Sequence, residues 1–91
     1  YENIYVYFEK CFNFIEECIK IKGRVFIHCK AGKSRSVAIL CSYLMLKYGL
    51  NYENAIEIIK YKRPIIDVNY GFIIQLREFY LKKVAFLIKI K

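Results

Sequence analysis

The chain has 91 residues, of which 57% are hydrophobic and 26% charged, and its formal net charge at pH 7 is +8. This length allows one domain at most, and the abundance of Tyr, Phe and Ile excludes a disordered tail, which is poor in aromatic and β-branched residues. Charged residues interrupt every apolar run before it reaches the length of a membrane span, so no stable membrane insertion is expected.

The positive charge favours an anionic partner, such as nucleic acid, an acidic membrane surface or a phosphate-bearing substrate, unless it only reflects a compositional bias toward Lys. No groove-reading motif accompanies the charge, so a nucleic-acid partner is not expected. The four cysteines form no C-x-x-C pair, and the first residues show no secretory signal. We therefore expect reduced thiols in the cytoplasm. One His and scattered Cys lack metal-ligand spacing, so neither a metal nor a cofactor is expected.

The first predicted element is a helix that ends at Gly23. Its apolar residues recur at three- and four-residue steps, which is typical of one buried helix face. Glycine suits the position just after a helix. Two cysteines on this face, Cys11 and Cys18, are expected to be buried as small hydrophobic residues. The predicted apolar face consists of Ile4, Phe8, Cys11, Phe12, Ile15 and Ile19.

A strand buried on both faces is predicted over 24–28, because a continuous run of β-forming residues follows a glycine there. A polar loop over 29–34 then leads to a helix over 36–48, with Gly49 as its stop. The residues of this helix that we expect to point inward are Val37, Leu40, Cys41, Leu44, Met45 and Tyr48.

A third helix is predicted to begin after Asn51, a good N-cap residue, and to end before Arg63-Pro64. A loop over 65–69 leads to a fourth helix from residue 70 to about residue 83. The tail over 84–90 is open to two interpretations, an extension of that helix or an edge strand. The expected core face of the fourth helix consists of Phe72, Leu76, Phe79 and Tyr80.

A doubly buried strand needs neighbouring strands to satisfy its backbone N–H and C=O groups. This sequence supplies one confident strand and at most one more. The predicted fold class is therefore α/β, with a central sheet flanked by helices. Residues 1–91 would form a partial domain, mostly its helical C-terminal part together with the central strand. The missing strands are expected before Tyr1 or from another chain.

The loop between the predicted strand and the second helix carries the chemistry. A tight loop at a helix N-terminus points several backbone N–H groups at one spot, which attracts anions. Gly32 permits backbone angles that a side chain would block. Cys29 can aim its sulfur at the same spot, where a positive field typically lowers a thiol pKa to roughly 3.5–7.5 and so favours the nucleophilic thiolate. The segment reads His28-Cys29-Lys30-Ala31-Gly32-Lys33-Ser34-Arg35-Ser36.

Two residues after the glycine turn complete this site. Arg35 lies where the helix begins, and its planar fork can bind two oxygens of a tetrahedral anion. Ser36 can donate its hydroxyl to the sulfur and ease its departure, while His28 is expected to orient the loop and tune the thiol. The spacing H-C-x-x-G-x-x-R-[ST] is the cysteine-phosphatase signature and indicates a phosphocysteine intermediate. The expected phosphate-binding residues are Lys30, Ala31, Gly32, Lys33, Ser34 and Arg35.

From Ile4 to about Lys82 the chain resembles the C-terminal half of a dual-specificity protein phosphatase catalytic domain. The resemblance includes Tyr7-Phe8, Phe14-Ile15, Tyr43-Leu44-Met45, Ala55, Arg63-Pro64-Ile65, Asn69-Tyr70-Gly71-Phe72 and Gln75-Leu76. It implies the cysteine-phosphatase fold, with Cys29 as nucleophile, Arg35 binding phosphate and Ser36 assisting thiolate departure. It also implies that Asn69 braces the loop, although Asn69 equally suits the N-cap of the fourth helix. Val68 departs from the family, which usually has Pro before this Asn.

Phosphate transfer also needs a proton on the leaving oxygen. The family uses an Asp whose position falls just before Tyr1. Asp67 is interpreted as a loop residue, and Glu2 lies nearest to the required place without being a convincing acid. These residues alone are therefore expected to act weakly, on good leaving groups such as aryl phosphates.

The expected substrate is a phosphoprotein carrying phospho-Tyr, with phospho-Ser/Thr also open. Lys30 and Lys33 leave a phosphoinositide phosphatase of the same fold as an alternative, because extra cations attract multiply charged phosphates. A second alternative is a phosphate-binding scaffold with little turnover, since the acid is missing. The sequence does not predict the oligomeric state.

Overall fold

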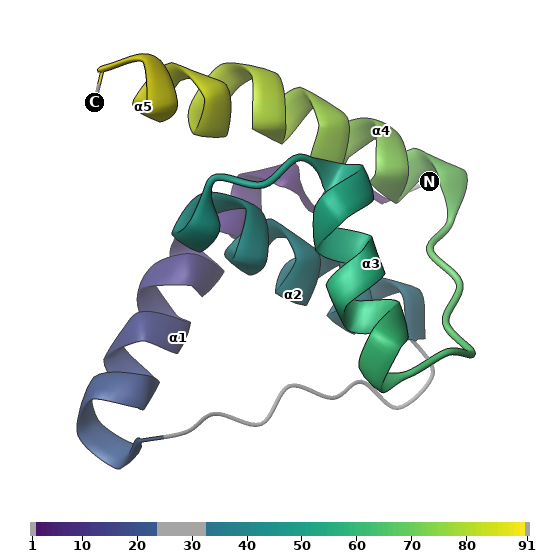
Figure 1. Cartoon of the computed structure of the whole chain (residues 1–91), viewed down its shortest axis with the longest axis horizontal. Helices are drawn as coiled ribbons and strands as arrows, with labels where there is room; N and C mark the ends of the chain where they lie inside the picture. Colours follow the sequence, from purple (N-terminus) through teal and green to yellow (C-terminus); the bar gives the residue numbers. More distant parts are fainter. Residues whose placement is uncertain (1, 24–32, 91) are drawn as a thin grey trace.

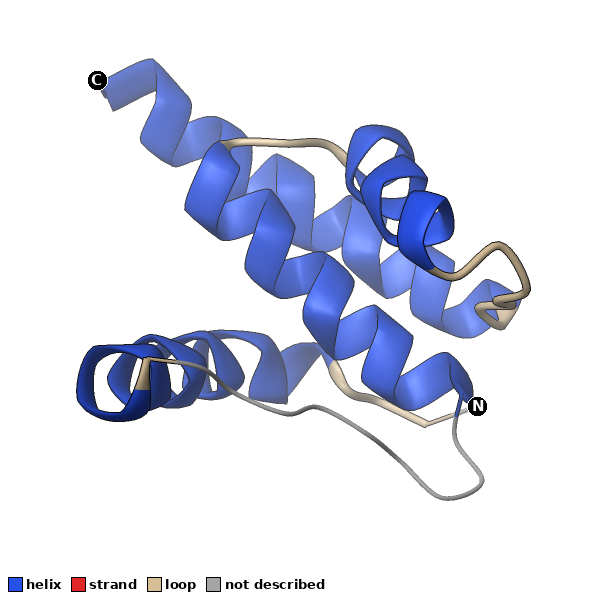
Figure 2. Ribbon diagram, turned by 60° about the horizontal axis from the view of Figure 1, so that its bottom comes forward, coloured by secondary structure: helices blue, strands red, loops and turns tan. Residues whose placement is uncertain are grey.

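The computed structural model describes residues 2–23 and 33–90, and within these ranges every regular element is a helix (Figures 1 and 2). A short 3₁₀ turn, η1 (Tyr5–Tyr7), leads into α1 (Phe8–Lys22). The helices α2 (Lys33–Tyr48) and α3 (Tyr52–Lys62) follow. The chain then forms one long helix, composed of α4 (Tyr70–Phe79), the π-helical turn η2 (Tyr80–Val84) and α5 (Ala85–Ile90). No helix among the described residues has the length and apolar character needed to cross a bilayer.

Local sequence signals set most of the helix boundaries. Gly23 has a φ of 76°, and its N–H donates to the carbonyl of Ile19, which is the left-handed helix end that glycine favours. Gly49 has a φ of 69° directly after α2. The side chain of Asn51 accepts a hydrogen bond from the N–H of Asn54 and caps α3. These helix ends confirm the boundaries predicted for them from the sequence.

The helix α2 lies at the centre, in contact with α1, α3, α4 and η2. Its residues Ala38, Cys41 and Met45 are fully buried. An aromatic cluster joins the N-terminal segment to α4, with ring centroids 5.1 Å apart between Phe8 and Phe79. The other core residues are apolar side chains of the N-terminal segment, α3, the loop before α4, α4 and η2, namely Ile4, Ala55, Ile56, Ile59, Val68, Phe72, Leu76 and Val84.

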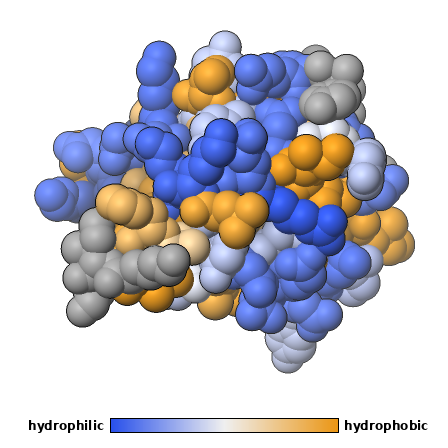
Figure 3. Space-filling model, turned by 90° about the horizontal axis from the view of Figure 1, so that it is seen from above, coloured by the Kyte–Doolittle hydropathy of each residue, from blue (hydrophilic) through white to orange (hydrophobic). Residues whose placement is uncertain are grey.

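The tail over 84–90 extends the fourth helix and does not form a strand. Phe79 and Val84 are both buried, although on an ideal α-helix residues five apart point about 140° away from each other. The π-helical turn η2 lies between them, and its wider i→i+5 spacing keeps both side chains on the core side. From above this long helix, Figure 3 shows separate apolar patches among hydrophilic residues. Val84 at the end of η2 is buried, whereas Phe86, Leu87 and Ile88 of α5 are exposed.

Several expectations about burial and boundaries were wrong. Cys11 and Cys18 are half-buried, because the described neighbours pack on only part of the surface of α1. Cys41 is buried as expected. Tyr48 is 63% exposed, since it is the last residue of α2 and lies at the end of the packed region. The helix α2 also begins at Lys33, three residues before the predicted start at Ser36. A helix can extend this way because the N–H groups of its first turn need no intrahelical partners.

Candidate active site

The beginning of α2 is the part of the candidate site that the structure describes. Arg35 is the third residue of this helix, so it lies in the first helical turn as the sequence predicted. The backbone N–H groups of a first turn point out of the helix end, and the helix dipole adds positive potential there. The predicted site residues His28, Cys29, Lys30, Ala31 and Gly32, together with the strand predicted over 24–28, lie outside the described residues. Their placement and roles therefore stay predictions.

Arg35 forms an ion pair with Glu2 across 33 positions of sequence. Its terminal nitrogen Nη2 donates to Oε1 of Glu2 at 2.5 Å. The two side chains are 53% and 49% exposed, respectively. Pairs this exposed contribute on the order of 0.2–1 kcal/mol to stability.

Gln75 holds the segment that carries Glu2. Its side-chain oxygen accepts hydrogen bonds from the N–H groups of Ile4, at 2.8 Å, and Tyr5, at 2.9 Å. Its side-chain nitrogen donates to the carbonyls of Glu2, at 2.8 Å, and Gly71, at 3.2 Å. Gln75 is only 7% exposed, and an amide side chain has two donors and one oxygen acceptor, so these four bonds occupy it fully. The N-terminal segment is thereby fixed to α4.

The sequence analysis did not find these roles of Gln75 and Glu2. One signal was available for Gln75, which is the lone polar residue on the helix face formed by Phe72, Leu76 and Phe79. A buried amide is costly unless it is hydrogen-bonded, so a glutamine at this position predicts a specific partner. The identity of that partner depends on residues about seventy positions away and has no local signature.

Asn69 caps the N-terminus of α4, which confirms one of the two roles predicted for it, that of an N-cap residue. Its side-chain oxygen accepts a hydrogen bond from the N–H of Phe72 at 2.8 Å. The preceding Val68 is buried in the core, so apolar packing fixes this segment where the family usually has Pro. Asp67 is exposed, in agreement with its interpretation as a loop residue. The predicted bracing of the phosphate loop by Asn69 involves residues outside the described ranges and stays a prediction.

Ser36 is half-buried in the first turns of α2, beside Arg35 in sequence, and its assistance to the thiolate stays a prediction. Lys33 and Ser34 are the first two residues of α2, not loop residues as predicted. Burial raises the pKa of the Cys41 thiol to about 12, so Cys41 is unreactive at neutral pH. Within residues 2–23 and 33–90, His, Cys, Asp and Glu form no group of three that would hold a metal ion.

An arginine at the start of a helix, next to a loop of signature sequence, is the arrangement of a cysteine-dependent phosphatase. Comparison with known families identifies the family within this class. A family model described as the dual specificity phosphatase catalytic domain matches residues 1–82, and the chain belongs to this family. The chain is 45% identical over 76 residues to dual specificity protein phosphatase 1 of Arabidopsis thaliana, covering 84% of this chain and 38% of that protein. It is 41% identical over 81 residues to mouse dual specificity protein phosphatase 19, covering 89% of this chain and 37% of that protein.

Solved structures of the family share the fold. The crystal structure of DUSP15 matches with a TM-score of 0.83 and 38% identity, covering 94% of this chain and 55% of that one. A mouse putative dual specificity phosphatase complexed with zinc tungstate matches with a TM-score of 0.86 and 30% identity, covering 96% and 55% of the two chains. The chain thus spans about two fifths of these curated relatives and about half of these solved chains. The expected central sheet is not confirmed, because the described residues are helical and the predicted strand lies outside them.

Proposed function

We propose that this chain carries the phosphate-binding and nucleophilic part of a protein phosphatase that works through a phosphocysteine intermediate. The observation that carries the proposal is the signature His28–Ser36 in a chain that belongs to the dual specificity phosphatase family. The position of Arg35 in the first turn of α2 supports it, because a guanidinium there can bind the same anion as the loop amides.

In the proposed first step, the Cys29 thiolate attacks phosphorus. The S–P bond forms while the bond from phosphorus to the leaving oxygen breaks, and that oxygen takes a proton from a general acid. In the second step, water attacks the phosphocysteine, inorganic phosphate leaves and the thiolate returns. Arg35 and the loop from Lys30 to Ser34 would hold the charged oxygens in both steps, and the Ser36 hydroxyl would donate to the departing sulfur.

We also propose that the central sheet includes the strand predicted over 24–28, and that its other strands and the general acid lie outside these 91 residues. The chain spans only 38% of one curated relative and 55% of one solved chain, which supports this proposal. So do three exposed apolar side chains of the N-terminal segment and α1, Val6, Phe14 and Ile21, which are 60%, 65% and 70% exposed, respectively. Phe14 and Ile21 lie seven positions apart in α1 and therefore on the same side of this helix, and exposed apolar patches often mark contact surfaces. A nucleophile that must stay reduced further supports a cytoplasmic location.

The proposed substrate is a phosphoprotein, because relatives along most of this chain are named protein phosphatases. A second candidate is phosphate binding with little turnover. It rests on the lack of a convincing general acid among these residues. One relative that is 38% identical over 87 residues is named for an interaction, serine/threonine/tyrosine-interacting protein A, from Xenopus laevis. A solved human structure at 34% identity carries a related title, tyrosine phosphatase-like serine/threonine/tyrosine-interacting protein.

Trapping of the intermediate separates the two candidates. The protein at its natural length and the 91-residue chain are each incubated with an aryl phosphate, quenched in acid and analysed by mass spectrometry. We expect a phosphate adduct on Cys29 that is absent in Cys29→Ser and retained in Cys18→Ser, a matched cysteine control. Absence of both adduct and phosphate release, in a folded protein that still binds tungstate, would support the binding candidate. Phosphotyrosine peptides and phosphoinositide vesicles, assayed in parallel, distinguish the protein from the lipid substrate.

A further inference from the structure

We propose that Glu2 is a positioning residue, which holds the guanidinium of Arg35 ready for the phosphate group, and that Gln75 fixes Glu2 in place. This inference rests on the proposed function, because it assumes that Arg35 binds phosphate. It adds to the site a residue that is neither part of the signature loop nor the expected general acid. Its basis is a chain of contacts from α4 through the N-terminal segment to α2.

The first link is the attachment of the N-terminal segment to α4. Gln75 uses all of its donors and its oxygen acceptor, and three of its four bonds go to the backbone of Glu2, Ile4 and Tyr5. Ile4 is 1% exposed, and the ring of Tyr5 lies 5.8 Å from that of Phe79 on α4. Hydrogen bonds and packing together therefore fix the backbone from which the Glu2 side chain extends.

The second link is the ion pair itself. Nη2 of Arg35 donates to Oε1 of Glu2, a charge-assisted hydrogen bond between two ionised side chains. A guanidinium carries five N–H donors on three nitrogens, and this contact is made by one terminal nitrogen. Glu2 thus contacts one edge of the guanidinium group.

Two effects of Glu2 on phosphate binding oppose each other. Arginine loses much rotamer freedom when it binds a ligand, and a guanidinium that is already ordered loses less. The carboxylate also repels a phosphate dianion, although solvent weakens this repulsion at a site where both side chains are about half exposed. We infer that the ordering effect is the larger one, because the Gln75 anchor gives the carboxylate a fixed position.

The test measures the affinity for tungstate, a tetrahedral dianion, together with KM and kcat for an aryl phosphate in the protein at its natural length. Glu2→Ala should weaken tungstate binding about three- to fivefold, the range that an exposed ion pair supports. It should raise KM more than it lowers kcat. Glu2→Gln keeps an oxygen that accepts from Nη2, so it should recover part of the loss.

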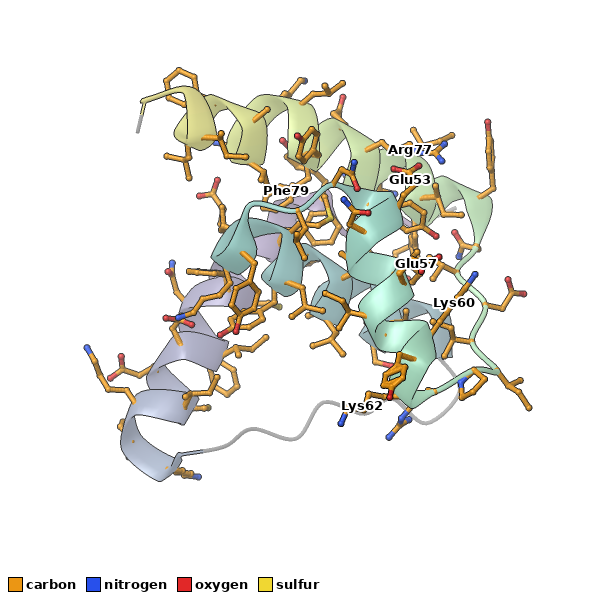
Figure 4. All side chains as sticks on the ribbon, viewed as in Figure 1. Glu53, Glu57, Lys60, Lys62, Arg77 and Phe79 are labelled. Carbon is orange, nitrogen blue, oxygen red and sulfur yellow. The ribbon has the colours of Figure 1, made fainter. Side chains whose placement is uncertain are left out.

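The control is Glu53→Ala, which removes the same charge from another exposed ion pair. Oε2 of Glu53 lies 2.6 Å from Nη2 of Arg77, and Figure 4 shows the two side chains facing each other between α3 and α4. This variant should leave tungstate affinity and KM unchanged.

Gln75→Leu should reproduce the effect of Glu2→Ala, with thermal melting showing that the variant is folded.

Unchanged or tighter tungstate binding in Glu2→Ala would overturn the positioning role, and tighter binding would identify Glu2 as a competitor of the phosphate. A loss equal to that of Glu53→Ala would overturn it as well, because the effect would then be one of net charge. If the unmodified protein neither binds tungstate nor forms a phosphocysteine, the proposed function itself is rejected. The two failures are thus distinguishable.

Discussion

Replacing Gln75 by Leu should destabilise the protein far more than a surface substitution does. Leucine has a similar size but no polar atoms, so the N–H of Ile4 and the carbonyl of Glu2 lose this partner. The N–H of Tyr5 keeps only its contact of 3.2 Å with the side-chain oxygen of Asn3. The N–H of Ile4 is buried, and leaving such a group unpaired costs about 1–3 kcal/mol. The groups of Tyr5 and Glu2 are part-buried and reach water in the variant, so each adds less.

The expected decrease in the free energy of unfolding is about 2–4 kcal/mol, after allowing for the greater hydrophobicity of leucine. Equilibrium unfolding in urea measures it, and hydrogen exchange at the amides of Ile4 and Tyr5 should accelerate. The matched control is Glu78→Leu on the same helix, where an exposed residue pairs with Lys82 at 3.4 Å. This control should change stability by less than about 0.5 kcal/mol. Equal effects of the two substitutions would refute the role of Gln75 as an anchor.

The helix boundaries could be predicted because their causes are local. Asn51 and Asn69 cap helices through hydrogen bonds to N–H groups three residues later, and Gly23 adopts a left-handed conformation at a helix end. Each of these effects is complete within a few residues. The Lys33 start of α2 was missed because a first turn needs no intrahelical hydrogen bonds and leaves a weaker signal than a cap.

Burial at the ends of helices could not be predicted from periodicity alone. The apolar face of α1 predicts which residues lie on one side, but not how far along the helix its neighbours extend. Ile15 is buried, whereas Ile19, one turn later on the same face, is 39% exposed. Cys18 and Tyr48 differ from expectation for the same reason, because each lies near the end of a helix.

The candidate site likewise has features that the sequence predicts and features that depend on tertiary contacts. The signature loop predicted the start of α2 as the site, and Arg35 does lie in the first turn of that helix. The pair between Glu2 and Arg35 and the anchor at Gln75 depend on tertiary contacts between distant segments. A polar residue on an apolar helix face shows that such a contact must exist, but only the fold shows what it connects.

Two further substitutions test other parts of this account. Asn51→Ala should lower the free energy of unfolding by about 1 kcal/mol, because the N–H of Asn54 loses its acceptor, whereas Asn54→Ala, which keeps that bond, should not destabilise the protein. The second concerns Cys41, whose thiol pKa is raised from 9.0 to about 12, first by burial and then by the nearby carboxylate of Glu53. Between these pKa values the native state holds a proton that the unfolded state has lost. The stability contributed by the neutral thiol is therefore complete below pH 9 and decreases toward pH 12, by at most about 1.4 kcal/mol per pH unit. Urea unfolding at pH 8–11 should show a shallower decline for Cys41→Ala than for the unmodified protein, and parallel declines would show that this thiol does not set the alkaline limit of the fold.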